Sequence, residues 1–154
     1  MAIRGESRWC GFWCLDFERV DLYNLRQMKK EMQVRVASLS GAVAVGLGAF
    51  GAHGLKQVLE SHQTAEVWET AVFYHFVHTL VLLWISDKAS MGEGPRRCFL
   101  FGMLVFSGTL YALSVTGIRW LGAITPIGGL ALIMGWGWMA VWSARGRDSA
   151  GTEV

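Results

Sequence analysis

The residues of this chain that could do chemistry are few, and they lie close together in the sequence. His53, Glu69, His75 and His78 are titratable, and Tyr74 lies beside the histidine pair. The spacing HFVH puts His75 and His78 on neighbouring surfaces of one helix. Such a pair could bind a metal ion, contact a haem or relay protons. A metal would need a further ligand, either His53 or a carboxylate, because two histidines leave its coordination incomplete.

A structural interpretation of the same residues is favoured. Polar side chains in a membrane often hydrogen-bond between helices, so His75, His78 and Tyr74 are predicted to hold helices in register. Glu69 lies about one turn into its segment, where a helix dipole stabilises a carboxylate; a proton-coupled role is the weaker alternative. His53 is predicted to act as a latch, a side chain that holds the first two helices together. It would have a further role if His75 or Glu69 lay within reach. No catalytic motif is present, so we predict no enzyme, no cofactor and no bound metal.

The elements that carry these residues are strongly apolar. Hydrophobic residues make up 53% of the 154 and charged residues 17%, and the charged ones avoid four stretches, 36–55, 70–86, 98–118 and 120–144. Stretches of this length can cross the hydrocarbon core as helices, and a backbone in lipid must bond within its own segment. The predicted fold is therefore all-α, a bundle of four transmembrane helices near 36–55, 68–86, 98–118 and 120–142.

The basic residues predict the orientation of the bundle. Twelve lie before the first span, between the second and third, or after the fourth; only Lys56 and Arg119 lie on the other side. Basic loops stay in the cytoplasm, so both termini are predicted to be cytoplasmic in a multi-pass protein of the cell (inner) membrane. The formal net charge of +2 is too small to indicate a nucleic-acid partner.

Small residues predict how the spans pack. In the first span they recur at every fourth position, and later spans carry glycines at suitable places; the predicted packing residues are Ser40, Ala44, Gly48, Ala52, Gly108, Gly128 and Gly129. Helices in lipid associate by close fit, which small residues permit. Some of these faces could serve a homo-oligomer or a membrane-protein partner. Pro126 either begins the fourth helix or kinks a longer one.

The segments outside the bundle are assigned separately. Residues 1–33 are an N-terminal extension, either a mis-assigned start upstream of Met32 or an amphipathic helix at the membrane surface. Residues 34–144 form the four-helix membrane domain. Residues 145–154 are predicted to be a disordered cytoplasmic tail. The cysteines Cys10, Cys14 and Cys98 form no CxxC pair, so they predict neither a disulfide framework nor a zinc site.

Four ordered motifs resemble one family. GAFGAHGLK at 48–56, WETAVFYHFVHTL at 68–80, FSGTLYAL at 106–113, and TPIGG at 125–129 followed by GW at 135–136 are similar to the DUF423 family. That family includes the bacterial UPF0382 inner-membrane proteins and the eukaryotic transmembrane protein 256. The resemblance covers about residues 34–142 and implies a small four-helix membrane protein with no established enzymatic activity.

The expected function is that of a non-enzymatic accessory or scaffold protein surrounded by the lipid bilayer. Abundant packing surfaces and the lack of a catalytic motif favour it. Two alternatives stay open at this point. One is a small oligomeric transporter or channel, and the other is a membrane protein that binds a metal or haem through its histidines.

Overall fold

A computed structural model describes the backbone of residues 8–88 and 91–148, and the side chains of residues 27–88 and 91–143. The described backbone is helical, with no strands. The elements are α1 (Arg8–His53), α2 (Lys56–His62), α3 (Ala65–Ile85), α4 (Gly94–Thr116), the 3-10 helix η2 (Arg119–Ala123) and α5 (Thr125–Asp148). The all-α prediction is confirmed.

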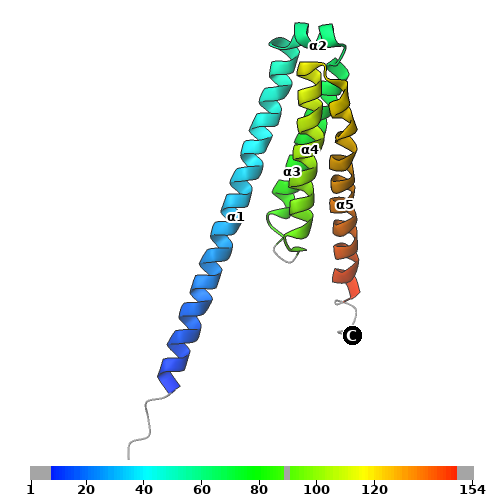
Figure 1. Ribbon diagram of the computed structural model, residues 1–154. Helices are drawn as coiled ribbons and strands as arrows, with labels where there is room; N and C mark the ends of the chain where they lie inside the picture. The colour runs from blue at the N-terminus through cyan, green and yellow to red at the C-terminus, as the bar shows by residue number, and fades with distance from the viewer. Residues whose placement is uncertain (1–7, 89–90, 149–154) are drawn as a thin grey trace, which may run out of the picture.

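Four long helices run alternately up and down the molecule, with the short α2 across one end (Figure 1). Helix α4 is central and packs against both α3 and α5, whereas α1 packs chiefly against α3. Buried apolar side chains gather where α1, α3, α4 and α5 meet, and include Ala37, Leu82, Phe99 and Leu132. The described helices therefore form a bundle in which α1 occupies an edge.

Three segments are long and apolar enough to cross a membrane: Gln27–His53, Gly94–Thr116 and Arg119–Ser143. They coincide with three of the four predicted spans. Helix α3 has the length of a span, about 31 Å for its 21 residues. It is absent from this set because two carboxylates and two histidines lower its mean hydropathy.

The α2 end of the bundle is closed by side chains. The His62 ring and the Thr64 hydroxyl both lie within hydrogen-bond distance of the Ser114 carbonyl near the end of α4, at 3.2 and 2.9 Å. Helix α4 ends at Gly117, whose φ of 71° suits a residue without a Cβ, and the His62 ring lies against it. The segment between α1 and α3 is thus a packed helical turn.

Pro126 is the second residue of α5, where its missing N–H would have no helical partner. The structure therefore supports the interpretation in which Pro126 begins the helix, and α5 is not kinked from a longer one at this point.

Helices extend into both segments outside the predicted bundle. Residues 8–33 continue into the first span as part of the single helix α1, and Met32 lies within it. Helix α5 runs on to Asp148, so residues 145–148 of the expected tail are helical. The remaining predicted regions, 1–7 and 149–154, lie outside the described residues.

Candidate functional site

His75 lies where α1, α3 and α4 meet, and both of its ring nitrogens face hydroxyl groups. Nε2 is 3.0 Å from the Ser40 hydroxyl of α1, and Nδ1 is 3.3 Å from the Tyr111 hydroxyl of α4. Ser40 also lies 3.0 Å from the Thr79 hydroxyl. A neutral imidazole donates through one nitrogen and accepts through the other, so both hydrogen bonds of the ring can form while His75 is uncharged. His75 thus joins three helices.

His78 faces the other side of α3. The indole Nε1 of Trp136 on α5 donates to His78 Nε2 over 3.4 Å. Since Nε2 accepts, the ring proton is on Nδ1, which donates to the Tyr74 carbonyl at 2.8 Å. The ring is 5% exposed and packs against Phe99. A proton on Nε2 would point at the indole N–H, so this arrangement holds the neutral ring.

The two histidines therefore do not share a ligand site. Their ring nitrogens contact groups on different helices, and His53 lies exposed at the end of α1. Among the described residues, no group of three or more His, Cys, Asp or Glu side chains could hold a metal ion. Among these described residues, neither His53 nor a carboxylate is brought to the histidine pair as the further ligand that a metal would need.

The predicted latch at His53 is replaced by a different contact. Within residues 27–88 and 91–143, no hydrogen bond joins His53 to Glu69 or His75. Instead, Trp68 Nε1 donates to the Leu47 carbonyl of α1 at 3.1 Å, and the Trp68 indole is 4% exposed. His53 does not share this contact: it lies two residues beyond Gly51, which the indole covers, and its side chain is exposed.

Tyr74 and Glu69 are placed at the edge of the bundle. Tyr74 is partly exposed and stacks between the His78 ring and the Phe106 ring. Glu69 is exposed on the first turns of α3. Of the residues around this site, His75, His78 and Trp68 link the helices through their ring nitrogens.

The small residues of α1 differ in their surroundings. Ala44 is fully buried and a Cβ at Gly48 would lie 3.3 Å from Val72, so both lie against α3. Gly51 is buried beneath the Trp68 indole, with no room for a Cβ. The Ser40 hydroxyl lies within hydrogen-bond distance of His75, and Ala52 is exposed.

Helices α4 and α5 approach each other closely at Gly128. A Cβ at Gly128 would overlap the Phe106 backbone and lie 2.9 Å from the Gly102 carbonyl. Gly129 is less confined, 3.7 Å from the Phe106 ring. Gly108 lies on an exposed face of α4 with nothing within 4 Å, so its predicted packing role has no partner among the described residues.

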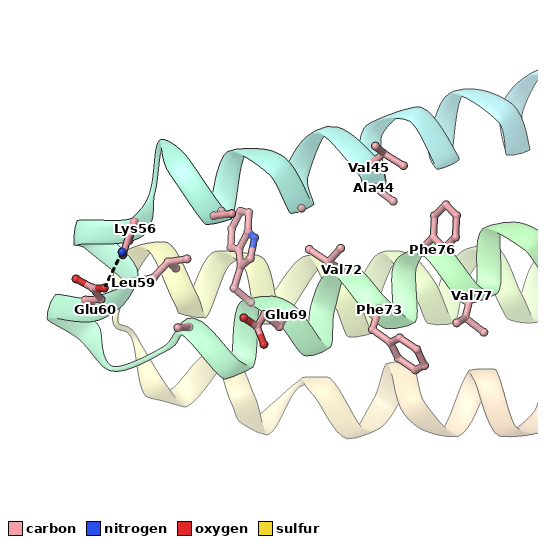
Figure 2. A pocket seen from close by; sticks show the side chains of 15 residues that line it. Ala44, Val45, Lys56, Leu59, Glu60, Glu69, Val72, Phe73, Phe76 and Val77 are labelled. Atoms are coloured by element: carbon pink, nitrogen blue, oxygen red, sulfur yellow. Dashed lines mark ion pairs between the residues drawn. The ribbon is translucent and has the colours of Figure 1, made fainter.

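A groove of about 610 Å³ lies between α1 and α3. Figure 2 shows Val45 of α1 facing Val72 and Phe76 of α3 across it. Gly48 and Gly51 of α1 also line it, where Val72 and the Trp68 indole of α3 come close to them. This volume is in the range of small-molecule sites, and the lining is mostly apolar.

Charged side chains gather at one end of the groove, beside α2. Lys56 and Glu60 lie 4.0 Å apart and are both well exposed, and Glu69 lies nearby on α3 (Figure 2). The other end is lined by Ala44 and Val77, without charge. The groove is therefore amphiphilic along its length.

At the opposite end of the bundle, α1 is held by ion pairs. Lys29 Nζ lies 2.9 Å from a carboxylate oxygen of Glu93, just before α4, and Lys30 pairs with Asp87 after α3. Hydrogen bonding from Lys29 lowers the pKa of Glu93 below its usual value near 4.5, and Lys30 likewise lowers the pKa of Asp87. These pairs are exposed, so each contributes little to stability by itself.

Comparison with known proteins gives the family. The model of the family "Protein of unknown function (DUF423)" matches residues 47–129, more than half of the chain. The chain belongs to the DUF423 family. The matched segment of this DUF423 member begins at the Trp68 contact on α1 and ends at the glycine pair of α5.

Relatives of this DUF423 protein carry membrane names. It is 45% identical over 107 residues to the UPF0382 membrane protein YwdK of Bacillus subtilis, covering 66% of this chain and 86% of the relative. It is 37% identical over 115 residues to the UPF0382 membrane protein C1782.12c of Schizosaccharomyces pombe, covering 69% and 96%. No solved structure matches the chain. These findings confirm the predicted family and a membrane protein.

Sequence reasoning missed Trp68 and Trp136 as partners of the polar groups. Each is an aromatic residue with a polar atom inside or beside an apolar span, and such residues need a hydrogen-bond partner when buried. That requirement was a signal for their involvement, although the sequence could not say which partner each would find.

Proposed function

We propose that this DUF423 protein is a non-enzymatic accessory protein of the cell membrane, the inner membrane in bacteria, and binds a membrane-embedded partner between α1 and α3. The observation that carries this proposal is the groove itself. Helix α1 packs chiefly on α3 and leaves an open, apolar cleft of about 610 Å³ along the seam. A cleft of this kind facing lipid is a binding surface for another membrane component.

The polar residues inside the bundle support a non-enzymatic role. His75 and His78 use both ring nitrogens on other helices or on the backbone, and Trp68 uses its N–H on α1. A general base or nucleophile must be free to reach a substrate, whereas these groups already bond within the protein. Their arrangement fits the interhelical contacts that stabilise membrane bundles.

Four spans with both termini in the cytoplasm complete the proposal. Lys29 of α1 pairs with Glu93 at the start of α4, while His62, just after α1, contacts Ser114 near the end of α4. Helices α1 and α4 thus run in the same direction, and the chain between them must return across the membrane. Helix α3 does so with a length of about 31 Å, close to the hydrocarbon thickness. The basic-residue bias then favours cytoplasmic termini.

Photocrosslinking from the groove tests the proposal. A photoreactive phenylalanine analogue replaces Val45, which lines the groove, or Val43, which is similarly exposed on α1 but lies outside it. In native membranes we expect a discrete adduct from position 45 and only a diffuse set of products from position 43. Identical products from both positions would contradict a specific partner, because they would reflect the surrounding bilayer alone.

A further inference from the structure

We infer that the occupant of the groove is a single glycerophospholipid with a primary ammonium headgroup, taken from the leaflet on the α2 side. This inference rests on the proposed function, since it names the partner class for the same groove. It is carried by the length of the groove and by the charges at its end.

The length of the groove matches one leaflet. Its lining on α3 runs from Ala65 to Val77, which is about 18 Å along a helix axis. The hydrocarbon core of a bilayer is about 30 Å thick, so one leaflet contributes about 15 Å. A transmembrane helix of a partner protein would cross both leaflets and would need a seam twice as long. An acyl chain spans only one leaflet, so the length of the groove is sufficient for it.

The lining of the groove suits an acyl chain. Val45, Val72 and Phe76 provide apolar walls between the two helices, and Gly48 lies against Val72. Phe73 is 64% exposed and stands at the rim. An unbranched hydrocarbon chain lying in this cleft would gain contacts on both sides, while lipid passing over a flat helix surface gains them on one side only.

The charges at the α2 end suit a zwitterionic headgroup. Lys56 can pair with a phosphate, and the carboxylates of Glu60 and Glu69 can accept hydrogen bonds from an ammonium. A primary ammonium has three N–H donors, whereas a quaternary amine has none. A purely anionic headgroup would leave both carboxylates without a cation other than Lys56.

Native mass spectrometry of the purified full chain tests this inference, with phosphatidylethanolamine, phosphatidylcholine and phosphatidylglycerol added separately. We expect one phosphatidylethanolamine to be retained, and the other two lipids to be lost at the same activation energy. Equal retention of the three lipids would overturn the inference, since it would mean ordinary surrounding lipid only.

Two matched pairs of variants locate the lipid. Ala52→Trp fills the groove from α1, whereas Ala49→Trp adds the same bulk to an exposed position outside it. We expect loss of the bound lipid in the first variant and retention in the second. Equal retention in both would overturn the inference.

The second pair of variants, at Glu69 and Glu66, changes charge without changing packing. It therefore tests the inference even if Ala52→Trp folds poorly. Glu69→Gln should weaken retention of phosphatidylethanolamine about threefold, the scale of an exposed charge pair. Glu66→Gln, on the same helix end but outside the groove, should leave it unchanged. Equal effects of the two substitutions would overturn the headgroup assignment.

The photocrosslinking experiment separates this inference from the proposed function. A lipid adduct at position 45 supports both. A discrete protein adduct there, including a second copy of this chain, would overturn the lipid inference and leave the accessory function standing. Identical products at positions 45 and 43 would overturn both.

Discussion

The Trp68 indole of α3 lies directly over Gly51 of α1 and donates its N–H to the Leu47 carbonyl. This contact fixes α1 on α3 near the α2 end, and it closes the groove on one side. It depends on a glycine, because any Cβ at position 51 would overlap the indole ring.

Gly51→Ala should therefore destabilise the protein. The indole must move and lose its hydrogen bond, and overpacking of this kind lowers the free energy of unfolding by about 1–3 kcal/mol. Thermal unfolding in detergent measures the change. Gly46→Ala on the same helix is the control, since a Cβ there meets nothing within 4 Å. Similar melting temperatures for the two variants would mean that the indole contact is unimportant.

Gly128→Ala should be the more damaging of two substitutions in α5. The added Cβ would meet the Phe106 backbone, which cannot move aside as a side chain can, so we expect a loss of about 3 kcal/mol or more. Gly137→Ala adds a Cβ in open space and should be neutral or slightly stabilising. The two variants are compared by the fraction of each protein that stays monodisperse after heating. Equal fractions would refute the close α4–α5 approach.

Ser40 and His75 should be energetically coupled. A double-mutant cycle of Ser40→Ala and His75→Phe isolates their interaction, and polar pairs in membrane bundles average about 0.6 kcal/mol. The free energy of unfolding of the four proteins gives the coupling. The metal content of the purified protein should not change in any of them. Additive effects would indicate that His75 does not bond α1.

Acid should loosen α1 at the end away from α2. The pKa of Glu93 is lowered in the folded protein, so its pairing with Lys29 stabilises the fold above the usual pKa near 4.5 and is lost as the pH falls through the lowered value. Asp87 with Lys30 acts in the same direction. The melting temperature should decline modestly between pH 7 and pH 3, and Glu93→Gln should reduce this decline. Glu31→Gln, whose partner Arg35 lies on the same helix, should leave the decline unchanged.

The transmembrane topology can be checked with reporters that work only in the cytoplasm. In the proposed topology α3 returns the chain across the membrane, so fusions after Lys88 and at the C-terminus should be active and a fusion after Ile118 inactive. An inactive fusion after Lys88 together with an active one after Ile118 would show that α3 does not cross.

The sequence predicted the helices well because the signals are local. A charge-free stretch shows the length of a span directly. For Pro126 the sequence left two interpretations open, and the structure has the one in which Pro126 begins the helix. The family motifs likewise lie in order along the chain, and three of the four predicted spans meet the criteria of length and hydropathy.

The partners of the polar residues were harder to predict, because they depend on how helices rotate against one another. A strict four-residue repeat drifts by about 40° per step around a helix, so Ser40 and Ala52 end about 120° apart. The helix therefore presents Ala37, Ala44 and Gly51 as buried positions, Ser40 turns toward His75, and Ala52 is exposed along the groove. The repeat was visible in the sequence, but the direction of the neighbouring helix was not.

The connection between α1 and α3 is built as part of the bundle, and this bears on how the protein can be engineered. His62 and Thr64 both contact the Ser114 carbonyl, and the His62 ring covers Gly117. An epitope tag or a fused domain inserted between residues 58 and 64 would separate these groups from α4 and unfold the helix end, although the segment is short and polar. Insertions succeed where the backbone makes few contacts. For labelling the protein, this turn is the wrong place.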